Sequence, residues 1–283
     1  MKILITGASG FIGKNLLNNL SEKYKIALIT KKKIKNKKYI YIKSELSNIK
    51  KYKKKILKFE PKILIHLAWE GIPDLGKINS KKNSKDQLDF FKFIIRIKSI
   101  KRIIVTGSCL EYGSLKGKIK EDRRIRNYSH FSKAKLKIYN FLKKNLKRKT
   151  KLVWLRLFYV YGKLQREDAL IPYIINKIKE KKEIYLQEPY SAKDFVNVND
   201  VCKAILIFIE NNKSGVFNVG TGIATNPLQI VKIISKLKKV EFSLKYKNNK
   251  KSSFYADTKK INKCGWKPDM SFIKYIKNLI KNK

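Results

Sequence analysis

Cysteine and histidine are scarce in this 283-residue chain, which has three cysteines and two histidines. Cys109, Cys202 and Cys264 show no paired spacing and are too few for a disulfide framework in a protein of this length. No His/Cys cluster has the spacing of metal ligands, so we expect no metal site. This cysteine usage predicts a reducing, cytoplasmic setting.

Long apolar runs are also missing from the sequence. No stretch approaches the ~20 uninterrupted apolar residues that a membrane helix requires, and we therefore expect no membrane contact. Met1 is followed at once by the apolar pattern of a strand, which leaves no room for a signal peptide. Both observations agree with a cytoplasmic protein.

Arginine provides only eight of the 68 basic residues, and the remaining 60 are lysines spread from Lys2 to Lys283. The formal net charge of +47 by itself predicts attraction to polyanions such as nucleic acid. A protein that reads nucleic acid more often concentrates arginine and exposed aromatic residues in one patch. Because scattered lysine beside abundant Ile, Asn and Tyr is typical of an AT-rich coding sequence, we do not expect a nucleic-acid partner.

Strand and helix patterns alternate along the first 158 residues. Apolar runs typical of buried strands are followed by segments with apolar residues at helical spacing. The expected strands are 2–6, 26–29, 39–42, 62–68, 102–106 and 152–158, and the expected helices are 11–21, 49–59, 87–97 and 131–146. This alternation predicts an α/β fold with a doubly wound, mostly parallel sheet of the Rossmann type, covered by helices on both faces.

The pattern loosens after Tyr161 and Gly162. Helices are expected at 170–181, 201–210, 227–237 and 272–280, a short strand at 216–219, and a solvated loop at 245–251. A chain of this length can form two tightly joined lobes. We expect a dinucleotide-binding domain over residues 1–165, to which 194–212 returns, and a smaller C-terminal substrate-binding lobe over residues 166–283.

A glycine-rich turn follows the first expected strand and opens the first expected helix. A pyrophosphate needs backbone N–H groups without side chains in the way, and a helix N-terminus facing it. The order of strand, glycine triplet and helix is the context that confirms a dinucleotide-binding turn. We expect NAD or NADP to bind here, on Gly7, Ser9, Gly10, Phe11, Ile12 and Gly13.

The end of the second strand selects between the two dinucleotides. An acidic residue there binds the ribose 2′-OH of NAD, whereas a cation accommodates the 2′-phosphate of NADP. No Asp or Glu follows Ile29, and Thr30 and the run Lys31–Lys33 occupy that place. We therefore expect NADP, with Lys31 and Lys32 at the phosphate, and NAD is the alternative.

Several segments resemble the extended short-chain dehydrogenase/reductase family, specifically its NAD(P)-dependent nucleotide-sugar epimerases, dehydratases and reductases. The resemblance covers nearly the whole chain. It lies in the glycine turn 7–13, His66-Leu67-Ala68-Trp69, and segments 106–113 (TGSCLEYG), 155–162 (LRLFYVYG), 193–201 (KDFVNVNDV) and 217–220 (FNVG). The amino-acid sequence of segments 66–71 and 111–113 is most similar to that of members that reduce a 4-keto-6-deoxyhexose attached to a nucleoside diphosphate.

The resemblance implies a catalytic serine, tyrosine and lysine. Ser108 lies four residues before Tyr112, as in the family, and would hold the carbonyl oxygen that becomes negative when the carbon accepts hydride. Lys133 would lower the pKa of the catalytic tyrosine and bind the nicotinamide ribose. Leu67 and Ala68 would line the cofactor.

The spacing of the predicted acid departs from the family pattern, Tyr-x-x-x-Lys. Ser129 stands four residues before Lys133, and Tyr128 stands five residues before it. On a helix, four residues place two side chains about 40° apart, and five place them about 140° apart. We expect Tyr128 to be the acid, with Ser129 capping the helix so that Tyr128 lies outside it. Asn127, like Ser129, is a residue type that favours a turn or a helix N-cap. The alternative is that the catalytic site is impaired.

The resemblance further implies that Trp69, Glu70 and Ser108 contact the sugar. The family's arginine is replaced by Lys193, so we expect Arg166 to bind the diphosphate instead. The predicted function is an NADP-dependent oxidoreductase that reduces a keto group of a nucleotide-activated (6-deoxy)hexose. One alternative is a cofactor-retaining NAD-dependent epimerase or dehydratase, and a second is an impaired member that binds dinucleotide or RNA. The sequence leaves open whether the protein forms a homodimer. A dehydratase usually has an acidic pair, and Glu111 offers one carboxylate at most.

Overall fold

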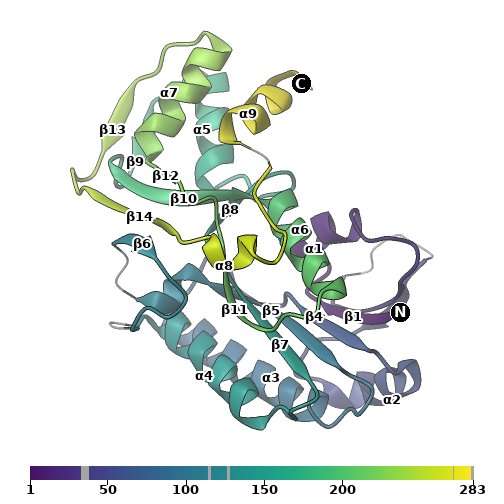
Figure 1. Ribbon diagram of the computed structural model, residues 1–283. Helices are drawn as coiled ribbons and strands as arrows, with labels where there is room; N and C mark the ends of the chain where they lie inside the picture. Colours follow the sequence, from purple (N-terminus) through teal and green to yellow (C-terminus); the bar gives the residue numbers. More distant parts are fainter. Residues whose placement is uncertain (33–37, 114–115, 126–127, 270, 282–283) are drawn as a thin grey trace. The chain divides into compact units, whose positions relative to one another are not determined.

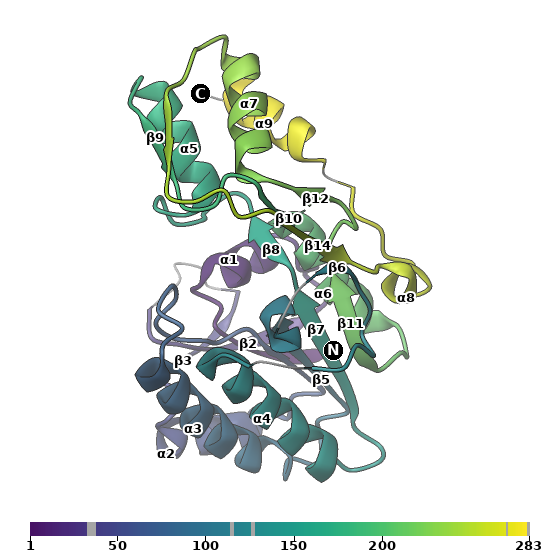
Figure 2. The same cartoon turned by 90° about the vertical axis from the view of Figure 1, so that its left-hand side faces the viewer.

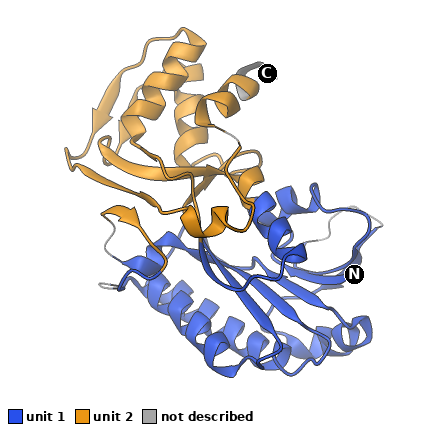
Figure 3. Ribbon diagram, in the orientation of Figure 1, with its two compact units in different colours: residues 1–114, 122–157, 202–217 blue, residues 115–121, 158–201, 218–283 orange. Residues whose placement is uncertain are grey.

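The computed structural model describes residues 1–32, 38–113, 116–125, 128–269 and 271–281. The chain divides into two compact units, which we describe separately (Figure 3). Unit 1 contains residues 1–114, 122–157 and 202–217, and unit 2 contains residues 115–121, 158–201 and 218–283. Lys33 and Asn127, which the sequence analysis named, lie outside the described residues.

A seven-stranded sheet forms the framework of unit 1. In spatial order its strands are β11 (Gly215–Val219), β7 (Lys151–Leu157), β5 (Arg102–Ser108), β4 (Ile63–His66), β1 (Lys2–Thr6), β2 (Lys25–Thr30) and β3 (Ile40–Lys43). Neighbouring strands from β7 to β3 are parallel. The chain moves outward in one direction from β1 to β3 and in the other from β4 to β7, so the doubly wound sheet is confirmed.

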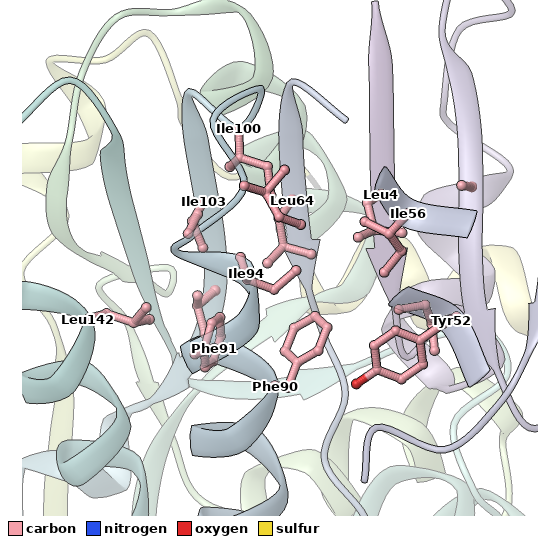
Figure 4. Close-up of a cluster of buried hydrophobic side chains, with 14 of the residues drawn as sticks. Leu4, Tyr52, Ile56, Leu64, Phe90, Phe91, Ile94, Ile100, Ile103 and Leu142 are labelled. Carbon is pink, nitrogen blue, oxygen red and sulfur yellow. The ribbon is translucent and has the colours of Figure 1, made fainter. Parts of the chain in front are cut away.

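Helices cover both faces of this sheet (Figures 1 and 2). One face carries α2 (Ile49–Phe59), α3 (Lys77–Ile94) and α4 (His130–Asn145), and the other carries α1 (Phe11–Leu17) and α6 (Val198–Glu210). Figure 4 shows the core of the first face, where side chains of the strands meet those of the helices: Leu4, Leu64 and Ile103 from the sheet, and Tyr52, Ile56, Phe90, Phe91, Ile94 and Leu142 from the helices. Burial of each large apolar side chain contributes about 1.5–3 kcal/mol.

Helix α3 begins ten residues earlier than the sequence pattern predicted. Its first half is polar, yet Ser80, Asn83 and Ser84 are buried. The amide of Asn83 accepts a hydrogen bond from Glu70 N at 2.8 Å and donates one to Glu70 O at 3.0 Å. Asn83 therefore fixes the loop after β4, and the polar first half of the helix shows no apolar periodicity.

Unit 2 has a smaller sheet with helices beside it. Its strands are β12 (Ala224–Thr225), β10 (Ser191–Asn197), β14 (Ser252–Ala256) and β6 (Gly117–Ile119), with β8 (Tyr159–Tyr161) paired to β10. A separate pair joins β9 (Ile184–Leu186) to β13 (Leu244–Tyr246). The helices are α5 (Leu170–Lys179), α7 (Pro227–Lys238), α8 (Lys259–Asn262) and α9 (Phe272–Lys281).

The prediction of a loop over residues 245–251 is therefore wrong for residues 245 and 246, which belong to β13. Leu244 packs against the apolar core of unit 2, and the parallel pairing of residues 244–246 with β9 continues the chain as a strand. Residues 247–251 are exposed, as predicted for a solvated loop. Among the helices that the structure describes, none combines the length and apolar character needed to span a membrane.

Candidate active site

The glycine turn lies where the winding direction of the sheet reverses, between β1 and β4. Gly7 has a φ of 74°, and a Cβ on it would lie 2.6 Å from Ala68 N. A Cβ on Gly13 would lie 2.3 Å from Gly7 O. Only glycine allows strand β1, helix α1 and the loop after β4 to approach so closely, and the crevice at this reversal is where such sheets bind ligands.

A cavity of about 550 Å³ opens at this crevice. It brings together most of the residues that the sequence analysis assigned to the cofactor and the sugar: Gly7, Ser9, Gly10, Lys31, Lys32, Leu67, Ala68, Trp69 and Glu70. Phe11, Ile12 and Gly13 form the first turn of α1, directly after Gly10. The cavity is of the size that holds a small-molecule cofactor.

The charges in this cavity are mixed, which the sequence analysis did not anticipate. Lys31 Nζ lies 2.9 Å from Glu70 Oε1 and 3.1 Å from Glu45 Oε1. The hydrogen bond that Lys31 donates to Glu70 is the main cause that raises the pKa of Lys31. Glu45 lies two residues after the third strand, and an acidic residue at a strand end is the sequence feature that could have predicted a carboxylate in this cavity. Beside Lys31 and Lys32, the cavity therefore carries carboxylates that could accept hydrogen bonds from ribose hydroxyls.

Ser108 ends β5 and is the N-cap of the short helix η1 (Cys109–Tyr112). Its Oγ accepts a hydrogen bond from Leu110 N at 3.2 Å, and its own N–H donates to Glu111 Oε1 at 2.8 Å. A serine hydroxyl that accepts one hydrogen bond can still donate its own proton. The side chain is partly exposed at the C-terminal edge of the sheet, so it can meet a ligand there.

Glu111 is fully buried, and its carboxylate is engaged by several donors. Arg156 Nε lies 2.9 Å from Glu111 Oε2, and Trp154 Nε1 donates to the same oxygen at 2.9 Å. Burial opposes the charge of Arg156, but Glu111 and Tyr112 outweigh it and raise the pKa of the guanidinium. A Cβ on Gly107 would lie 2.4 Å from Glu111 Oε1, so glycine makes room for the carboxylate. Glu111 thus fixes η1 and the backbone of Ser108.

His66 lies inside β4 and is hydrogen-bonded on both ring nitrogens. Its Nδ1 is 2.8 Å from Thr6 Oγ1, and its Nε2 is 3.0 Å from Gln87 Oε1. Burial lowers the pKa of His66 to about 3. The ring is therefore neutral at physiological pH and forms part of the core, so His66 is a structural residue.

The start of α4 has the cap that the sequence predicted. Ser129 is the N-cap, and its Oγ accepts a hydrogen bond from Ser132 N at 3.1 Å. Tyr128 lies just before the helix, and 44% of its surface is exposed. The role of Tyr128 as the acid stays a prediction.

The structure does not bring Lys133 to Ser108. Lys133 is exposed, and it lines a separate cavity of about 560 Å³ between α3 and α4, together with Lys77, Lys81 and Lys137. The physical reason is its helical position, because the inward face of α4 is defined by Phe131, Ala134, Ile138 and Leu142. A residue two positions after Phe131 points about 200° away from it.

Lys135 occupies the inward face instead, and the sequence analysis missed it. Its Nζ donates to Thr106 O at 2.9 Å and lies 4.3 Å from the centroid of the Trp69 ring. Burial lowers the pKa of Lys135 to about 8. Ser132 Oγ donates to Leu110 O. This face of α4 therefore contacts the backbone two residues before Ser108 and two residues after it. The signal was a lysine on the apolar face of a helix, four residues after Phe131.

Arg166 belongs to unit 2, where it lines a cavity of about 610 Å³ with Tyr159, Gln187 and Lys193. Its Nε lies 2.9 Å from Asp168 Oδ1 at the surface. Lys193 Nζ lies 5.0 Å from the centroid of the Tyr159 ring. Two cationic side chains in a partly aromatic cavity can bind an anionic ligand.

Asp194, the neighbour of Lys193, has a different position. It is buried, and its carboxylate accepts hydrogen bonds from Thr221 N at 2.7 Å, Gly222 N at 2.8 Å and Ala256 N at 3.0 Å. Burial raises the pKa of Asp194 although these hydrogen bonds oppose the rise. Asp194 therefore joins the loop after β11 to β14, which is a structural role.

A parallel doubly wound sheet, a glycine turn at its reversal point and a serine at the edge of β5 define a dinucleotide-binding α/β protein of the extended short-chain dehydrogenase/reductase type. Residues 3–220 match the NAD dependent epimerase/dehydratase family. The chain belongs to this family, whose characterised members related to this chain include nucleotide-sugar epimerases, reductases and dehydrogenases.

Relatives align with almost the whole chain. The ADP-L-glycero-D-manno-heptose-6-epimerase of Brachyspira hyodysenteriae is 28% identical over 300 residues, 95% of this chain and 93% of the relative. The dTDP-4-dehydro-6-deoxyglucose reductase of Escherichia coli is 25% identical over 320 residues, 99% of this chain and 96% of the relative. The structure of UDP-glucuronic acid 4-epimerase from Bacillus cereus with UDP-glucuronic acid and NAD has a TM-score of 0.86 at 22% identity. It covers 100% of this chain and 99% of its own.

Proposed function

We propose that this protein is an NADP-dependent oxidoreductase that reduces a keto group of a nucleotide-activated (6-deoxy)hexose. The observation that carries the proposal is Ser108, which η1 and Glu111 hold at the C-terminal edge of β5 with a hydroxyl proton to donate. The relative from Escherichia coli, named as a dTDP-4-dehydro-6-deoxyglucose reductase, supports a ketone as the substrate.

The residues of the β1/β4 crevice fit a dinucleotide. The glycine turn lets backbone N–H groups and the N-terminus of α1 approach a pyrophosphate, because no Cβ fits at Gly7 or Gly13. Lys32 would meet the 2′-phosphate of NADP, while Lys31 is shared with Glu45 and Glu70. When bound, the dinucleotide would supply hydride.

The protein's own groups would orient the substrate and stabilise charge. Ser108 would donate a hydrogen bond to the carbonyl oxygen, where negative charge develops. Trp69 and Glu70 would line the sugar, and Arg166 would bind the diphosphate as an anion. Glu111 would take no chemical part, because its carboxylate is already bound by Arg156 and Trp154.

A cofactor-retaining epimerase is the second candidate, and the 28% identical relative named as a heptose-6-epimerase favours it. The two functions differ in their net redox change. The experiment incubates purified protein with NADPH and a nucleoside diphosphate 4-keto-6-deoxyhexose, and separately measures dinucleotide that copurifies. Stoichiometric oxidation of added NADPH supports the reductase, whereas tightly bound NAD with isomerisation and no net oxidation supports the epimerase. Dinucleotide binding without turnover of any nucleotide sugar indicates an impaired member.

A further inference from the structure

We propose that Lys135 Nζ is the proton donor of this site, because Phe131 fills the helical position from which the family's tyrosine acts. The inference rests on the proposed function and deepens it. It replaces Tyr128 and Lys133 with a single group on the inward face of α4.

The register of α4 places Phe131 and Lys135 together. They are four residues apart and therefore about 40° apart around the helix, the relation of the Tyr-x-x-x-Lys pattern. Lys135 Nζ lies 5.9 Å from the centroid of the Phe131 ring, and the Phe131 ring lies 4.9 Å from that of Trp69. Both side chains are buried. A phenyl ring thus stands beside the lysine where a phenol would stand, and it has no proton to give.

The surroundings of Lys135 leave its ammonium able to act. One proton is donated to Thr106 O, two residues before Ser108, and the ring face of Trp69 attracts the remaining positive charge. Within the described part of the chain, no carboxylate lies at ion-pair distance from Nζ. The charged or titratable groups that face it from neighbouring elements are Glu111 of η1, which is paired with Arg156, and His66 of β4, which is neutral.

The chemistry balances with this one donor. Reduction of a ketone by hydride from the bound dinucleotide leaves the electron pair of the carbonyl on oxygen. An N–H bond of Lys135 breaks while the O–H bond of the new alcohol forms, and Ser108 holds the oxygen through a hydrogen bond. Lys135 is left as a neutral amine and takes its proton back from solvent. Burial lowers the pKa of Lys135 to about 8, which makes this exchange accessible near neutral pH.

The first experiment follows the titration of Lys135 without any ligand. In ¹³C NMR of protein labelled at lysine Cε, the signal that disappears in Lys135→Met identifies Lys135. We expect its midpoint near 8, well below the ordinary lysine value of about 10.4. A midpoint at the ordinary value would overturn the proposal, whether or not the protein turns over any sugar.

The second experiment compares single-turnover rates at saturating NADPH and sugar. Lys135→Met should lower the rate at least about a hundredfold, and the wild-type rate should fall above the midpoint found by NMR. Lys137→Met, an exposed lysine on the same helix, is the control for lost charge. Phe131→Tyr should raise the rate and move the alkaline limb of the profile, because it installs a hydroxyl beside Lys135.

Tyr128→Phe separates the two candidate donors. A large loss of rate in Tyr128→Phe, with a nearly normal rate in Lys135→Met, would overturn the proposal in favour of Tyr128. If Lys135→Met does not fold, the unchanged pH profile of Phe131→Tyr would also count against it. Binding of NADPH, followed by fluorescence, distinguishes this failure from that of the proposed function. Absence of dinucleotide binding would contradict the proposed function. Normal binding and turnover that do not depend on position 135 would contradict only the role of Lys135 as proton donor.

Discussion

Single side chains decide what the edge of β5 can do. The Ser108 hydroxyl accepts one hydrogen bond and lies partly exposed at the edge of the sheet, while the carboxylate of Glu111, three residues later, is bound by hydrogen bonds inside the protein. The same contrast separates Lys133, which is exposed, from Lys135, which is buried two positions later. At this scale a residue's role follows from its partners and burial more than from its type.

Ser108→Ala should lower turnover by a factor of about 10² to 10³, because it removes one donor to a developing oxyanion. The affinity for NADPH should stay almost unchanged, since Ser108 is not among the residues that line the β1/β4 cavity. Steady-state rates and fluorescence titration measure the two quantities. A normal rate in this variant would place the reacting carbonyl elsewhere.

The neutral state of His66 should make the protein sensitive to acid. Because burial lowers the pKa of His66 to about 3, the unfolded chain takes up this proton first. The stability contribution is complete above the unfolded value of about 6.5 and is lost as pH falls toward 3, by up to about 1.4 kcal/mol per pH unit. The free energy of unfolding, measured with urea at pH values between these two, should have a smaller slope against pH in His66→Gln than in the wild type. The slope should not change in His130→Gln, where the histidine is exposed. Equal slopes in wild type and His66→Gln would contradict the assignment.

Elements place these residues, and the ends of strands matter most. The ends of β1, β2, β3 and β4 meet at one cavity, so Lys31 of one strand end pairs with Glu45 and Glu70 of two others. Helix η1 performs a similar task at the end of β5, where it turns a strand residue into an N-cap.

NADPH should bind more tightly than NADH if Lys32 meets the 2′-phosphate. One charge-assisted hydrogen bond contributes about 1.5–3 kcal/mol, so Lys32→Ala should weaken NADPH about tenfold or more and leave NADH nearly unchanged. Lys50→Ala, an exposed lysine on α2, controls for the general positive charge. Fluorescence titrations at physiological salt give all the dissociation constants. Equal affinities of the wild type for the two dinucleotides would contradict the prediction.

Glu111→Gln tests whether η1 depends on its buried ion pair. The substitution leaves the Arg156 guanidinium buried without a counter-charge, and we expect a loss of about 3 kcal/mol or more in the free energy of unfolding. Glu60→Gln removes one partner of an exposed pair with Lys2, at 3.7 Å, and should cost less than about 1 kcal/mol. Chemical denaturation measures both variants. A cost for Glu111→Gln as small as that of the control would mean that η1 is held by other contacts.

At the scale of the whole molecule, the net charge of +47 is the dominant property. We expect the protein to bind nucleic acid weakly at low salt and to lose most of that affinity between about 50 mM and 200 mM salt, without competition from NADPH. Fluorescence anisotropy with a labelled RNA of random sequence tests this. Sequence-specific binding that survives the higher salt would instead support a nucleic-acid partner.

The sequence by itself determined the sheet, the glycine turn and the candidate serine. These features depend on local patterns: strands 2–6 and 102–106, helix 49–59 and the N-cap Ser129 follow from apolar periodicity and capping residues that neighbouring residues carry. A cofactor turn is equally local, because its three glycines lie within seven residues.

Only the tertiary structure decided which charged residues face the site. Lysine occurs on every face of the chain, so its identity could not separate Lys133 from Lys135, and packing of α4 against the sheet did so. Glu45 joins Lys31 because parallel strands end at the same edge, a relation between residues distant in sequence. Glu111 pairs with Arg156, which lies 45 residues later in the chain, and this ion pair makes Glu111 a structural residue. Long-range packing determines such contacts, and no local pattern records them.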